Sequence, residues 1–537
     1  MHSWADLKTY VRLLFQLPGF FGRSFSPEEA RAILERRLAE REANFLRVAE
    51  RGIFGYARSP YLPLFKMAGC GMADLRGMVL SKGLEESLST LREAGVYITF
   101  EEFKGRAPIV RGSLTLPVKA RDFDNPYLSS SYQLTSGGTT GAGTRVVMDL
   151  DFLLDTTPSR LLAFEAHGVL GAPTALWYGI LPDGTSINNL LRSTCFGSVP
   201  LKWFTPVTSR DIRPALIYRL ATYYIILLGR LRGHPIPWPE PVRLDQAVVI
   251  ARWISRMLRS EGRCLLRAHV SMAVRVCIAA REAGLDLTGA TLMGGGEPPT
   301  PAKVREITRS GARWVPTYVS AETGPIGYGC ARPADGNDVH FMKDVLALIQ
   351  HPRPVIGSDV TVDAFYFTTL LPTAPKLMLN VANDDYGVVD RRSCGCPLES
   401  YGYTEHLRDI HSYSKLTGEG MTLIGSDMLH ILQEVLPARF GGSSLDYQLI
   451  EEEDEQGFTR LSLIVSPRIH IDDDQQVIET VFEALRRGTS VADLARAQWS
   501  QARTLRVKRM EPISTARGKL MPLHLARRRQ ADAENQR

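Results

Sequence analysis

The N-terminal part of the chain has the hydrophobic pattern of an amphipathic helix. Between residues 25 and 56, apolar side chains recur three or four positions apart, which is the spacing of one helix face. Ser26 and Pro27, followed by two glutamates, form the combination of capping residue, first-turn proline and first-turn acids that begins many helices. The pattern predicts a helix over residues 25–56, inside a helical N-terminal segment of residues 1–60.

From about residue 150 to residue 330, longer segments with helical periodicity alternate with short apolar segments. The helical pattern of residues 265–283 is followed by the short apolar segment ATLM (290–293) and then by the helical segment KVREITRSG (303–311). Such alternation is typical of an α/β domain whose sheet has at least partly parallel strands. We place it in a large domain of residues 1–410.

The C-terminal part of the chain has a different order of patterns. Residues 444–467 predict two strands joined by an acidic turn, and residues 474–488 predict an amphipathic helix. A further strand, TLRVKRM, follows at residues 504–510. These elements predict a separate small α+β domain of residues 411–525. The basic residues 526–537 have no apolar period and are expected to form a disordered tail.

The most apolar segment, residues 215–231, has the sequence ALIYRLATYYIILLGRL. It contains Arg219 and Arg230 and is shorter than the roughly 20 apolar residues that a bilayer-crossing helix needs, so we expect no transmembrane span. A buried helix is the first interpretation of this segment. An interfacial helix that touches lipid is the alternative.

The composition excludes several classes of protein. Hydrophobic residues make up 44% and charged residues 23% of the 537 residues, which excludes disorder over most of the chain. The net charge of +6 suits small anionic ligands, and a nucleic-acid role would rest only on three arginines at 527–529, so no nucleic-acid partner is expected. Seven cysteines are too few for a secreted disulfide scaffold, and no signal-peptide cleavage site is recognisable, so we expect a cytoplasmic protein.

The segment YQLTSGGTTGAGTRVV (132–147) places glycines and hydroxyl residues between two apolar runs. Glycines let the backbone approach a ligand closely, and backbone N–H groups and hydroxyls then face an anion. The segment lacks the Gly-Lys-Ser/Thr ending of a Walker A loop. We expect a phosphate-binding loop of another kind, with a plain hairpin turn as the alternative. Its candidate binding residues are Thr135, Ser136, Gly137, Gly138, Thr139, Thr140, Gly141 and Gly143.

Three further segments strengthen this interpretation. They are GGGEPPTPAKVREI (294–307), YVSAETG (318–324) and RGKLMPL (517–523). With the glycine-rich segment before them, in this order, the chain resembles the adenylate-forming superfamily of acyl-CoA ligases, and within it the phenylacetate-CoA ligase branch. The resemblance covers about residues 100–525. It implies an α/β fold, in which a large N-terminal adenylate-forming domain is followed by a small, mobile α+β domain that carries a lysine.

The resemblance implies a reaction in two steps. A small carboxylic acid attacks the α-phosphate of ATP, with Mg²⁺ bound, and pyrophosphate leaves. A thiol, most often CoA, then takes the acyl group from the acyl-adenylate. This chemistry needs neutralised phosphate charge and a carboxylate that is aligned for attack.

The resemblance also implies roles for individual residues. Glu322 would hold Mg²⁺, Lys519 would serve adenylation, and Asp384 would bind the ribose hydroxyls, with Asp385 as the second choice. Tyr318 would stack on the purine. The residues implied for the adenine wall are Gly295, Gly296, Glu297 and Pro298. Without the resemblance, Tyr318 would be explained as a core tyrosine and Glu322 as an acid at the start of a helix. Asp384 would be part of an Asn-Asp-Asp turn, and Lys519 would be an exposed lysine.

The chain departs from the family pattern at several positions. Ala321 stands where the family has Ser or Thr, Val381 stands near the place of an arginine, and the hinge motif Gly-Arg-x-x-Asp is not recognisable around Lys415. That hinge moves the small domain between the two half-reactions. The departures keep two alternatives open: adenylation with a carrier-protein thiol or an amine as acceptor, and a non-catalytic nucleotide-binding homologue.

Cysteine and histidine residues form a second group of candidates. Cys330, His340, Cys394 and Cys396 offer three thiols and one imidazole, a set that suits a structural Zn²⁺ ion. Some members of the phenylacetate-CoA ligase branch look similar here, with Cys-x-Cys after the ribose motif. The spacing is not that of a standard zinc finger, and four unconnected residues in a reduced protein are the alternative.

The pocket for the acid is expected from residues 160–240. Aromatic residues in this range, such as Tyr178, Trp203 and Trp238, would suit an aryl or a fatty acid. Ordinary core packing explains the same residues equally well.

Overall fold

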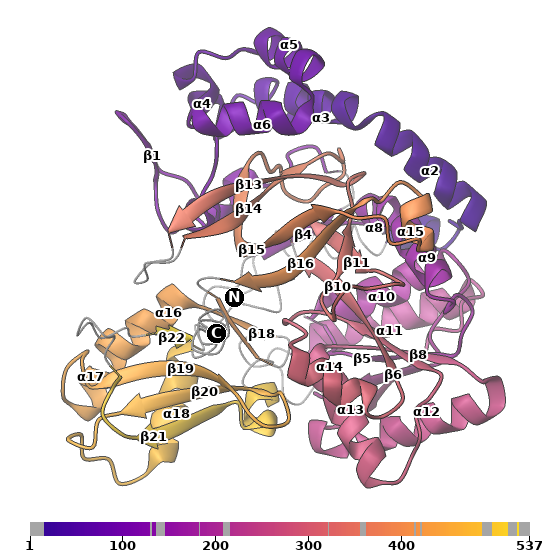
Figure 1. The fold of residues 1–537 in the computed structure, drawn as a ribbon, viewed down its shortest axis with the longest axis vertical. Helices are drawn as coiled ribbons and strands as arrows, with labels where there is room; N and C mark the ends of the chain where they lie inside the picture. The colour runs from indigo at the N-terminus through magenta and orange to yellow at the C-terminus, as the bar shows by residue number, and fades with distance from the viewer. Residues whose placement is uncertain are drawn as a thin grey trace.

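A computed structural model of the chain shows a helical N-terminal part, a long mixed sheet and a small domain beneath one side of it (Figure 1). The described residues are 15–128, 131–135, 145–181, 183–207, 215–320, 322–354, 361–412, 415–418, 421–485, 497–513 and 523–525.

The N-terminal helical pattern forms two helices and a π-helical turn instead of one helix. These are α2 (Pro27–Ala39), α3 (Arg41–Ala49) and η1 (Glu50–Phe54). Ser26 caps α2 as predicted, because its Oγ accepts the Glu29 N–H at 3.2 Å and the Glu29 carboxylate accepts the Ser26 N–H at 2.8 Å. The chain turns at Glu40 because α2 packs on a helix of the large domain while α3 packs on the neighbouring N-terminal helix α5 (Met72–Lys82).

Twelve strands form one sheet. Their bounds are β5 (Thr174–Trp177), β6 (Lys202–Thr205), β7 (Pro239–Pro241), β8 (Cys264–Ala268), β9 (Ala290–Gly294), β10 (Arg313–Ser320), β11 (Gly324–Gly329), β12 (Val339–Phe341), β13 (Leu346–Pro354), β14 (Thr361–Thr369), β15 (Val381–Arg391) and β16 (Glu405–Ser412). Their spatial order is β13-β14-β15-β16-β12-β11-β10-β9-β8-β5-β6-β7. The pairs from β10 to β7 are parallel and the others are antiparallel. The prediction of an α/β domain with partly parallel strands is confirmed.

The predicted helix over residues 265–283 is wrong at its start. Residues 265–268 belong to strand β8, and helix α13 (Val270–Glu282) begins only after His269. All five residues of β8 are buried, Arg267 included, and so short a buried segment has no period that distinguishes a strand from a helix.

Helices cover both faces of the parallel strands, and successive residues of β8 mark the two faces. Leu265 packs in a cluster with Phe164 of helix α9 (Thr157–Ala166). Leu266 packs in the opposite cluster, which includes residues of α12 (Val248–Glu261) and α13. Helix α10 (Gly184–Thr194) lies on the α9 side, where its Leu190 joins the main core.

The apolar segment forms helix α11 (Ala215–Leu231), but the prediction that this helix is buried is wrong for one of its faces. Its exposed apolar residues are Leu216, Leu220, Tyr223, Leu227 and Leu231. They lie three or four positions apart and therefore form one stripe along the helix. Among the described residues, no helix is long and apolar enough to cross a membrane.

The small domain has its own sheet and its own core. Its elements are β19 (Tyr447–Glu453), β20 (Thr459–Val465), α18 (Asp474–Leu485), β21 (Leu505–Arg509) and β22 (Leu523–Leu525). The strand order is β21-β20-β19-β22, and Leu449, Val481 and Trp499 pack in a cluster separate from the large domain. The predicted large domain followed by a small α+β domain is confirmed.

Candidate functional site

The carboxyl ends of the parallel strands bring three residues together at one edge of the sheet. Tyr178 follows β5, His269 follows β8 and Gly295 follows β9. The rings of Tyr178 and His269 meet edge to face with centroids 4.9 Å apart, and His269 Nδ1 lies 3.2 Å from the Gly295 carbonyl oxygen. Open α/β sheets bind ligands at this edge. The sequence alone does not single out His269, because a single histidine after a strand forms no motif.

The segment that begins at Gly294 passes between two neighbouring strands at very short range. A Cβ atom on Gly294 would lie 1.7 Å from the Ala268 carbonyl oxygen, and one on Gly295 would lie 2.0 Å from the Thr317 carbonyl oxygen. Gly296 has a φ of +86°, which disfavours any side chain. Only glycine fits these positions, so backbone atoms form this wall of the site.

Glu297, which the resemblance assigned to the adenine wall, places its carboxylate inside the protein. The carboxylate accepts hydrogen bonds from Ser271 N and Oγ, each at 2.7 Å, and pairs with Lys303 Nζ at 2.9 Å. Burial raises the pKa of Glu297, but the charge and hydrogen bonds of Lys303 and Ser271 outweigh burial and lower the pKa overall. The pair fixes the segment, up to the half-buried Pro298, to α13 and α14 (Pro301–Thr308).

Tyr318 is held by a carboxylate of strand β15. Its O–H donates to Asp385 Oδ2 at 2.6 Å, and Asn383 Nδ2 and Ser412 Oγ donate to the same carboxylate at 2.8 and 2.5 Å. Burial and the Asp385 charge raise the pKa of Tyr318, so the phenol keeps its proton. Asp384, the first choice for the ribose, lies beside this network. It is 1% exposed and has a φ of +73°.

Glu322 forms an ion pair with a lysine that the sequence analysis did not identify. Lys104 Nζ lies 2.5 Å from Glu322 Oε1, and the two side chains are 8% and 13% exposed. Lys104 directly follows the short helix α7 (Phe100–Phe103), 218 residues before its partner. No motif in the sequence links the two residues. An ammonium group therefore contacts the carboxylate that was expected to hold Mg²⁺.

The predicted phosphate loop connects two paired strands. Thr135 ends β3 (Ser131–Thr135), which pairs antiparallel with β4 (Arg145–Asp149). Residues 136–143, which make up the rest of the predicted loop, lie outside the described residues. Lys519 lies outside them as well, in the segment before β22.

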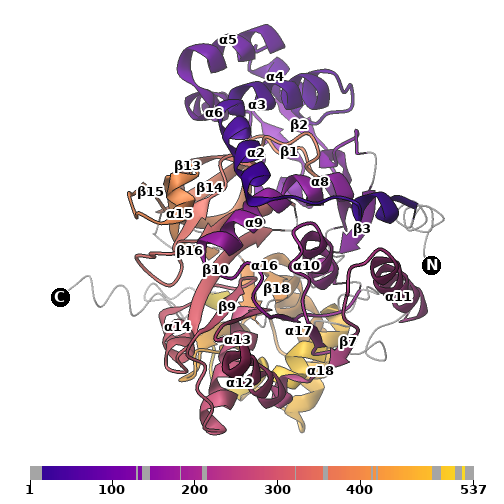
Figure 2. The same ribbon diagram turned by 90° about the vertical axis from the view of Figure 1, so that its right-hand side faces the viewer.

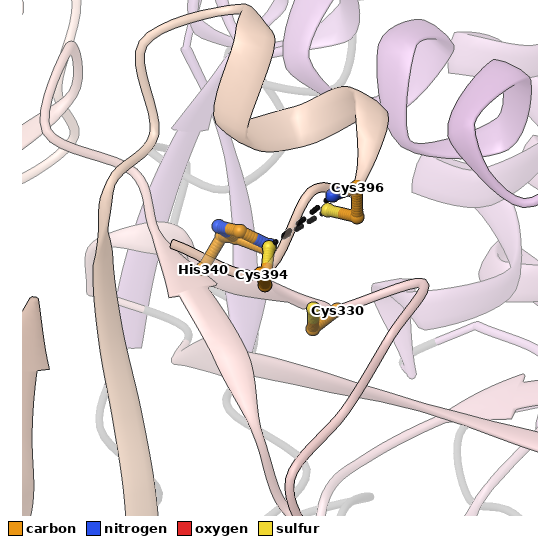
Figure 3. A group of neighbouring side chains, drawn as sticks. All are labelled: Cys330, His340, Cys394 and Cys396. Carbon is orange, nitrogen blue, oxygen red and sulfur yellow. Dashed lines mark hydrogen bonds between the residues drawn. The ribbon is translucent and has the colours of Figure 1, made fainter. Parts of the chain in front are cut away.

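The three cysteines and the histidine predicted as zinc ligands lie together (Figure 3). Cys330 follows β11, His340 lies in β12, and Cys394 and Cys396 belong to the turn between β15 and the short helix α15 (Pro397–Ser400). Their ligand atoms all lie within 4.8 Å of one another. In a tetrahedral zinc site with zinc–sulfur distances of about 2.3 Å, ligand atoms are roughly 3.5–3.8 Å apart, so small side-chain movements would close this group on an ion.

Neighbouring groups orient the histidine of this cluster. His340 Nδ1 lies 2.6 Å from the Tyr403 carbonyl oxygen, which can only accept, so Nδ1 carries the hydrogen and Nε2 faces Cys396 Sγ at 3.0 Å. A hydrogen bond from Cys330 is the main cause that lowers the pKa of the Cys396 thiol. The buried His406 stacks near His340, with ring centroids 4.1 Å apart, and its Nδ1 contacts Asp338 at 2.7 Å. These partners match the outer shell that metal-binding histidines use.

No protein-family model and no curated protein matches the chain. Among solved structures, the chain is similar to 2-hydroxyisobutyryl-CoA ligase in complex with 2-HIB-AMP and CoA, with a TM-score of 0.53 and 15% identity, over 95% of this chain and 93% of that chain. It is also similar to an amide bond synthetase, Mcba from Marinactinospora thermotolerans, with a TM-score of 0.38 and 10% identity, over 89% and 92% of the two chains. At this level of identity, the first likeness concerns the fold.

The Glu297–Lys303 pair is expected to control the stability of the large domain. Replacing Lys303 by Met leaves a buried carboxylate without its cation and should reduce the free energy of unfolding by about 3–5 kcal/mol, whereas the double variant Glu297→Gln/Lys303→Met should lose clearly less. Denaturant titration measures both. Equal losses in the two variants would contradict a direct pairing.

The free energy of unfolding should change with pH in the direction that the lowered pKa of Glu297 implies. The stabilisation that the charged Glu297 provides is complete above about pH 4.3, the pKa of a glutamate in the unfolded chain. It is lost as the pH falls through the lower pKa that Glu297 has in the folded protein. The difference in Tm between wild type and Glu297→Gln should therefore narrow below about pH 4. A difference that stays constant down to acid pH would speak against this assignment.

Proposed function

We propose that this chain, which has the fold of the adenylate-forming ligases, activates a small carboxylic acid with ATP and passes the acyl group to a thiol, with CoA as the favoured acceptor. In the first step a carboxylate oxygen bonds to the α-phosphorus of ATP as the bond to pyrophosphate breaks. In the second step a thiolate sulfur bonds to the acyl carbon as the bond to AMP breaks. The similarity of fold over 95% of the chain supports this proposal.

The observation that carries the proposal is the convergence of separate candidate segments at one edge of the sheet. Gly295 passes directly under the backbone of Thr317, the neighbour of Tyr318, and Tyr318 is bonded to Asp385. We place the adenine against the backbone of Gly295 and the ring of Tyr318. Following the resemblance, we assign the ribose hydroxyls to Asp384, which lies beside the Tyr318–Asp385 pair.

Glu322 is the proposed ligand of Mg²⁺, and Lys104 is the proposed counter-charge in the absence of the ion. A carboxylate is a preferred magnesium ligand, so the donor fits. When bound, the ion would neutralise phosphate charge. Until then the Lys104 ammonium, 2.5 Å from Glu322 Oε1, balances the negative charge of the carboxylate, and an ion bound to that oxygen would displace it.

The order of the segments favours the phenylacetate-CoA ligase branch. This resemblance concerns the arrangement of the domains and does not identify the acid. The segment around Lys415, which lacks the usual hinge motif, favours a second candidate, namely adenylation followed by transfer to a carrier-protein thiol or an amine. Both candidates share the first half-reaction and differ only in the acceptor.

We also propose that Cys330, His340, Cys394 and Cys396 hold one structural Zn²⁺ ion. The support is the gathering of three sulfur atoms and one imidazole nitrogen within 4.8 Å. A zinc ion there would tie β11, β12 and the turn before α15 to one another, and its binding free energy would add to the free energy of folding.

Acid-dependent exchange of pyrophosphate into ATP tests the adenylation step. We expect exchange with a carboxylic acid, Mg²⁺ and ATP, and a thioester on addition of CoA, detected by mass spectrometry. Exchange that depends on the acid without any thioester would shift the proposal to the second acceptor class. Absence of exchange with every acid would contradict the enzymatic proposal.

Lys519 is expected to act in the adenylation step. A cation near the α-phosphate stabilises the charge that develops in the transition state more than the charge of the separated reactants. Lys519→Ala should therefore lower pyrophosphate exchange by about 10²–10³-fold. The same variant should still transfer the acyl group from a supplied acyl-adenylate. Equal loss of both half-reactions would indicate misfolding or a role in thiol transfer.

Metal analysis of untagged protein tests the zinc site. We expect one zinc ion per chain in wild type, and Cys394→Ser should weaken zinc binding by more than about 100-fold and lower the Tm. Cys70→Ser is the matched control, because Cys70 is half-buried and lies outside the cluster. Protein that contains no zinc but has the same Tm as the wild type would contradict the proposal.

A further inference from the structure

Two buried arginines converge on one amide group behind the edge of the sheet. Arg160 of α9 donates from NH1 to Asn189 Oδ1 of α10 at 2.6 Å, and Arg267 of β8 donates to the same oxygen. Their exposed fractions are 4% and 5%. Arg160 also lies 3.4 Å from the phenol oxygen of Tyr328, and Arg192, one helical turn after Asn189, is buried beside them.

No carboxylate compensates this charge among the residues that the structure describes. Arg160 and Arg267 form no ion pair with them, and Arg267 Nε is buried without a hydrogen-bond partner there. Burial and the nearby Arg160 charge lower the pKa of Arg267 to about 10. Burial raises the pKa of Tyr328, but Arg160, Arg192 and Arg267 outweigh it and lower the pKa overall. The interior here is therefore strongly positive.

An arrangement of this kind is costly for the protein alone. A buried charge is normally paired, and two guanidinium groups that share one neutral amide oxygen repel each other. Proteins retain such costs at ligand sites, where the ligand supplies the missing charge. Guanidinium groups are also the donors that match a carboxylate in geometry and charge.

The position of the arginines connects them to the proposed site of the acid. Arg267 is the penultimate residue of β8, and His269, two positions later, contacts both Gly295 and the ring of Tyr178. Both arginines lie on the α9 and α10 side of the sheet, and Arg160 belongs to residues 160–240, from which the acid pocket was expected, whereas Arg267 lies outside that range. Trp177, an aromatic residue of the same range, packs in the cluster on the opposite face.

We propose that Arg160 and Arg267 bind a second carboxylate at the far end of the acid, so that this protein activates dicarboxylic acids. The inference rests on the proposed adenylating function. The arginines suit the reacting carboxylate less well than a second carboxylate. Two guanidinium groups would stabilise the reacting carboxylate as an ion and make it a weaker nucleophile. The arginines therefore bind and orient the acid, and they leave its other end free to react.

The test compares dicarboxylic acids with monocarboxylic acids of the same carbon number in ATP–pyrophosphate exchange. We expect wild type to favour a dicarboxylic acid by at least about 100-fold in kcat/KM, because a buried charge without its partner is costly. Arg267→Met should bring this ratio close to one, and Arg267→Lys should keep part of it. Arg263→Met, an exposed residue directly before β8, is the control and should keep the wild-type ratio.

A thermal measurement tests the same site without activity. Removing an uncompensated buried charge should leave the Tm of ligand-free Arg267→Met equal to or above that of wild type. A dicarboxylic acid should raise the Tm of wild type and not that of the variant. If no acid supports exchange but this difference is found, adenylation fails and the anion site stands. Equal use of monocarboxylic acids, or a preference that survives in Arg267→Met, would overturn the proposal.

A separate observation concerns the exposed stripe of α11, which consists of Leu216, Leu220, Tyr223, Leu227 and Leu231. Figure 2 shows α11 at the edge of the molecule. Trp238, 39% exposed, stands beside the stripe, where its ring meets that of Tyr223 with centroids 5.3 Å apart.

The charged residues of the segment 215–239 have one sign. Arg219 and Arg230 are exposed on the same helix face, Arg232 follows its end, and residues 215–239 contain no aspartate or glutamate. An apolar stripe with leucine, tyrosine and tryptophan, flanked by arginines, has the features of a helix that lies in a membrane interface. A second copy of the chain fits less well, because paired stripes would bring arginines of equal charge together.

We propose that the α11 stripe binds the surface of membranes that contain anionic lipid. Flotation with vesicles of phosphatidylcholine alone, and of phosphatidylcholine with phosphatidylglycerol, tests this. We expect binding only to the anionic vesicles, weakened by high salt. Leu220→Asp/Leu227→Asp should lower the bound fraction at least about tenfold, since both changes place charge in the interface. Leu80→Asp, at an exposed leucine of α5 outside the stripe, is the control and should leave binding unchanged.

Three results would overturn this second proposal. They are absence of binding to anionic vesicles, binding that persists in the double aspartate variant, and a dimer in solution that the same double variant dissociates. The last result would assign the stripe to a contact between copies of the chain.

Discussion

The site depends on the close approach of three strand ends, which is possible only because two consecutive glycines occupy the end of β9. Gly294 lies against the backbone of Ala268 and Gly295 against the backbone of Thr317, at distances that leave no room for a Cβ atom. A side chain at either position would separate β8, β9 and β10. His269, Tyr318 and the Gly295 backbone would then no longer share one edge of the sheet. The Glu297–Lys303 pair secures the same segment from the other side.

Two neighbouring parts of the large domain differ in how their charged side chains are paired. The proposed nucleotide residues are paired within the protein, with Glu322 bonded to Lys104 and Tyr318 bonded to Asp385. Behind the sheet edge, Arg160 and Arg267 share one amide oxygen and have no carboxylate among the described residues. A negatively charged ligand gains little binding free energy where the charges of the protein are already paired. It gains most beside positive charges that lack a carboxylate partner. In the proposed function, this contrast would make the arginines a determinant of which acid is accepted.

The cysteine cluster is a structural counterpart to the site. It joins the ends of β11 and β12 to the turn after β15, which is the strand that carries Asp384 and Asp385. A metal there would hold β15 in place relative to β11, the partner of the strand that carries Tyr318. The proposed zinc ion and the proposed ribose contact are thus connected through the same strand.

The sequence by itself determined the alternation of helices and strands, the small C-terminal domain, the capped start of α2 and the members of the cysteine cluster. The first three depend on spacing along the chain, which is visible in a sequence, whereas the cysteine cluster followed from its ligand types and from the resemblance to the family. The end of α2 at Glu40, the strand at residues 265–268 and the exposed face of α11 depend on what packs against each segment. The pairing of Lys104 with Glu322 and the meeting of Arg160 with Arg267 join residues more than 100 positions apart. Only the tertiary structure decided these contacts, because burial and charge pairing are properties of neighbours in space.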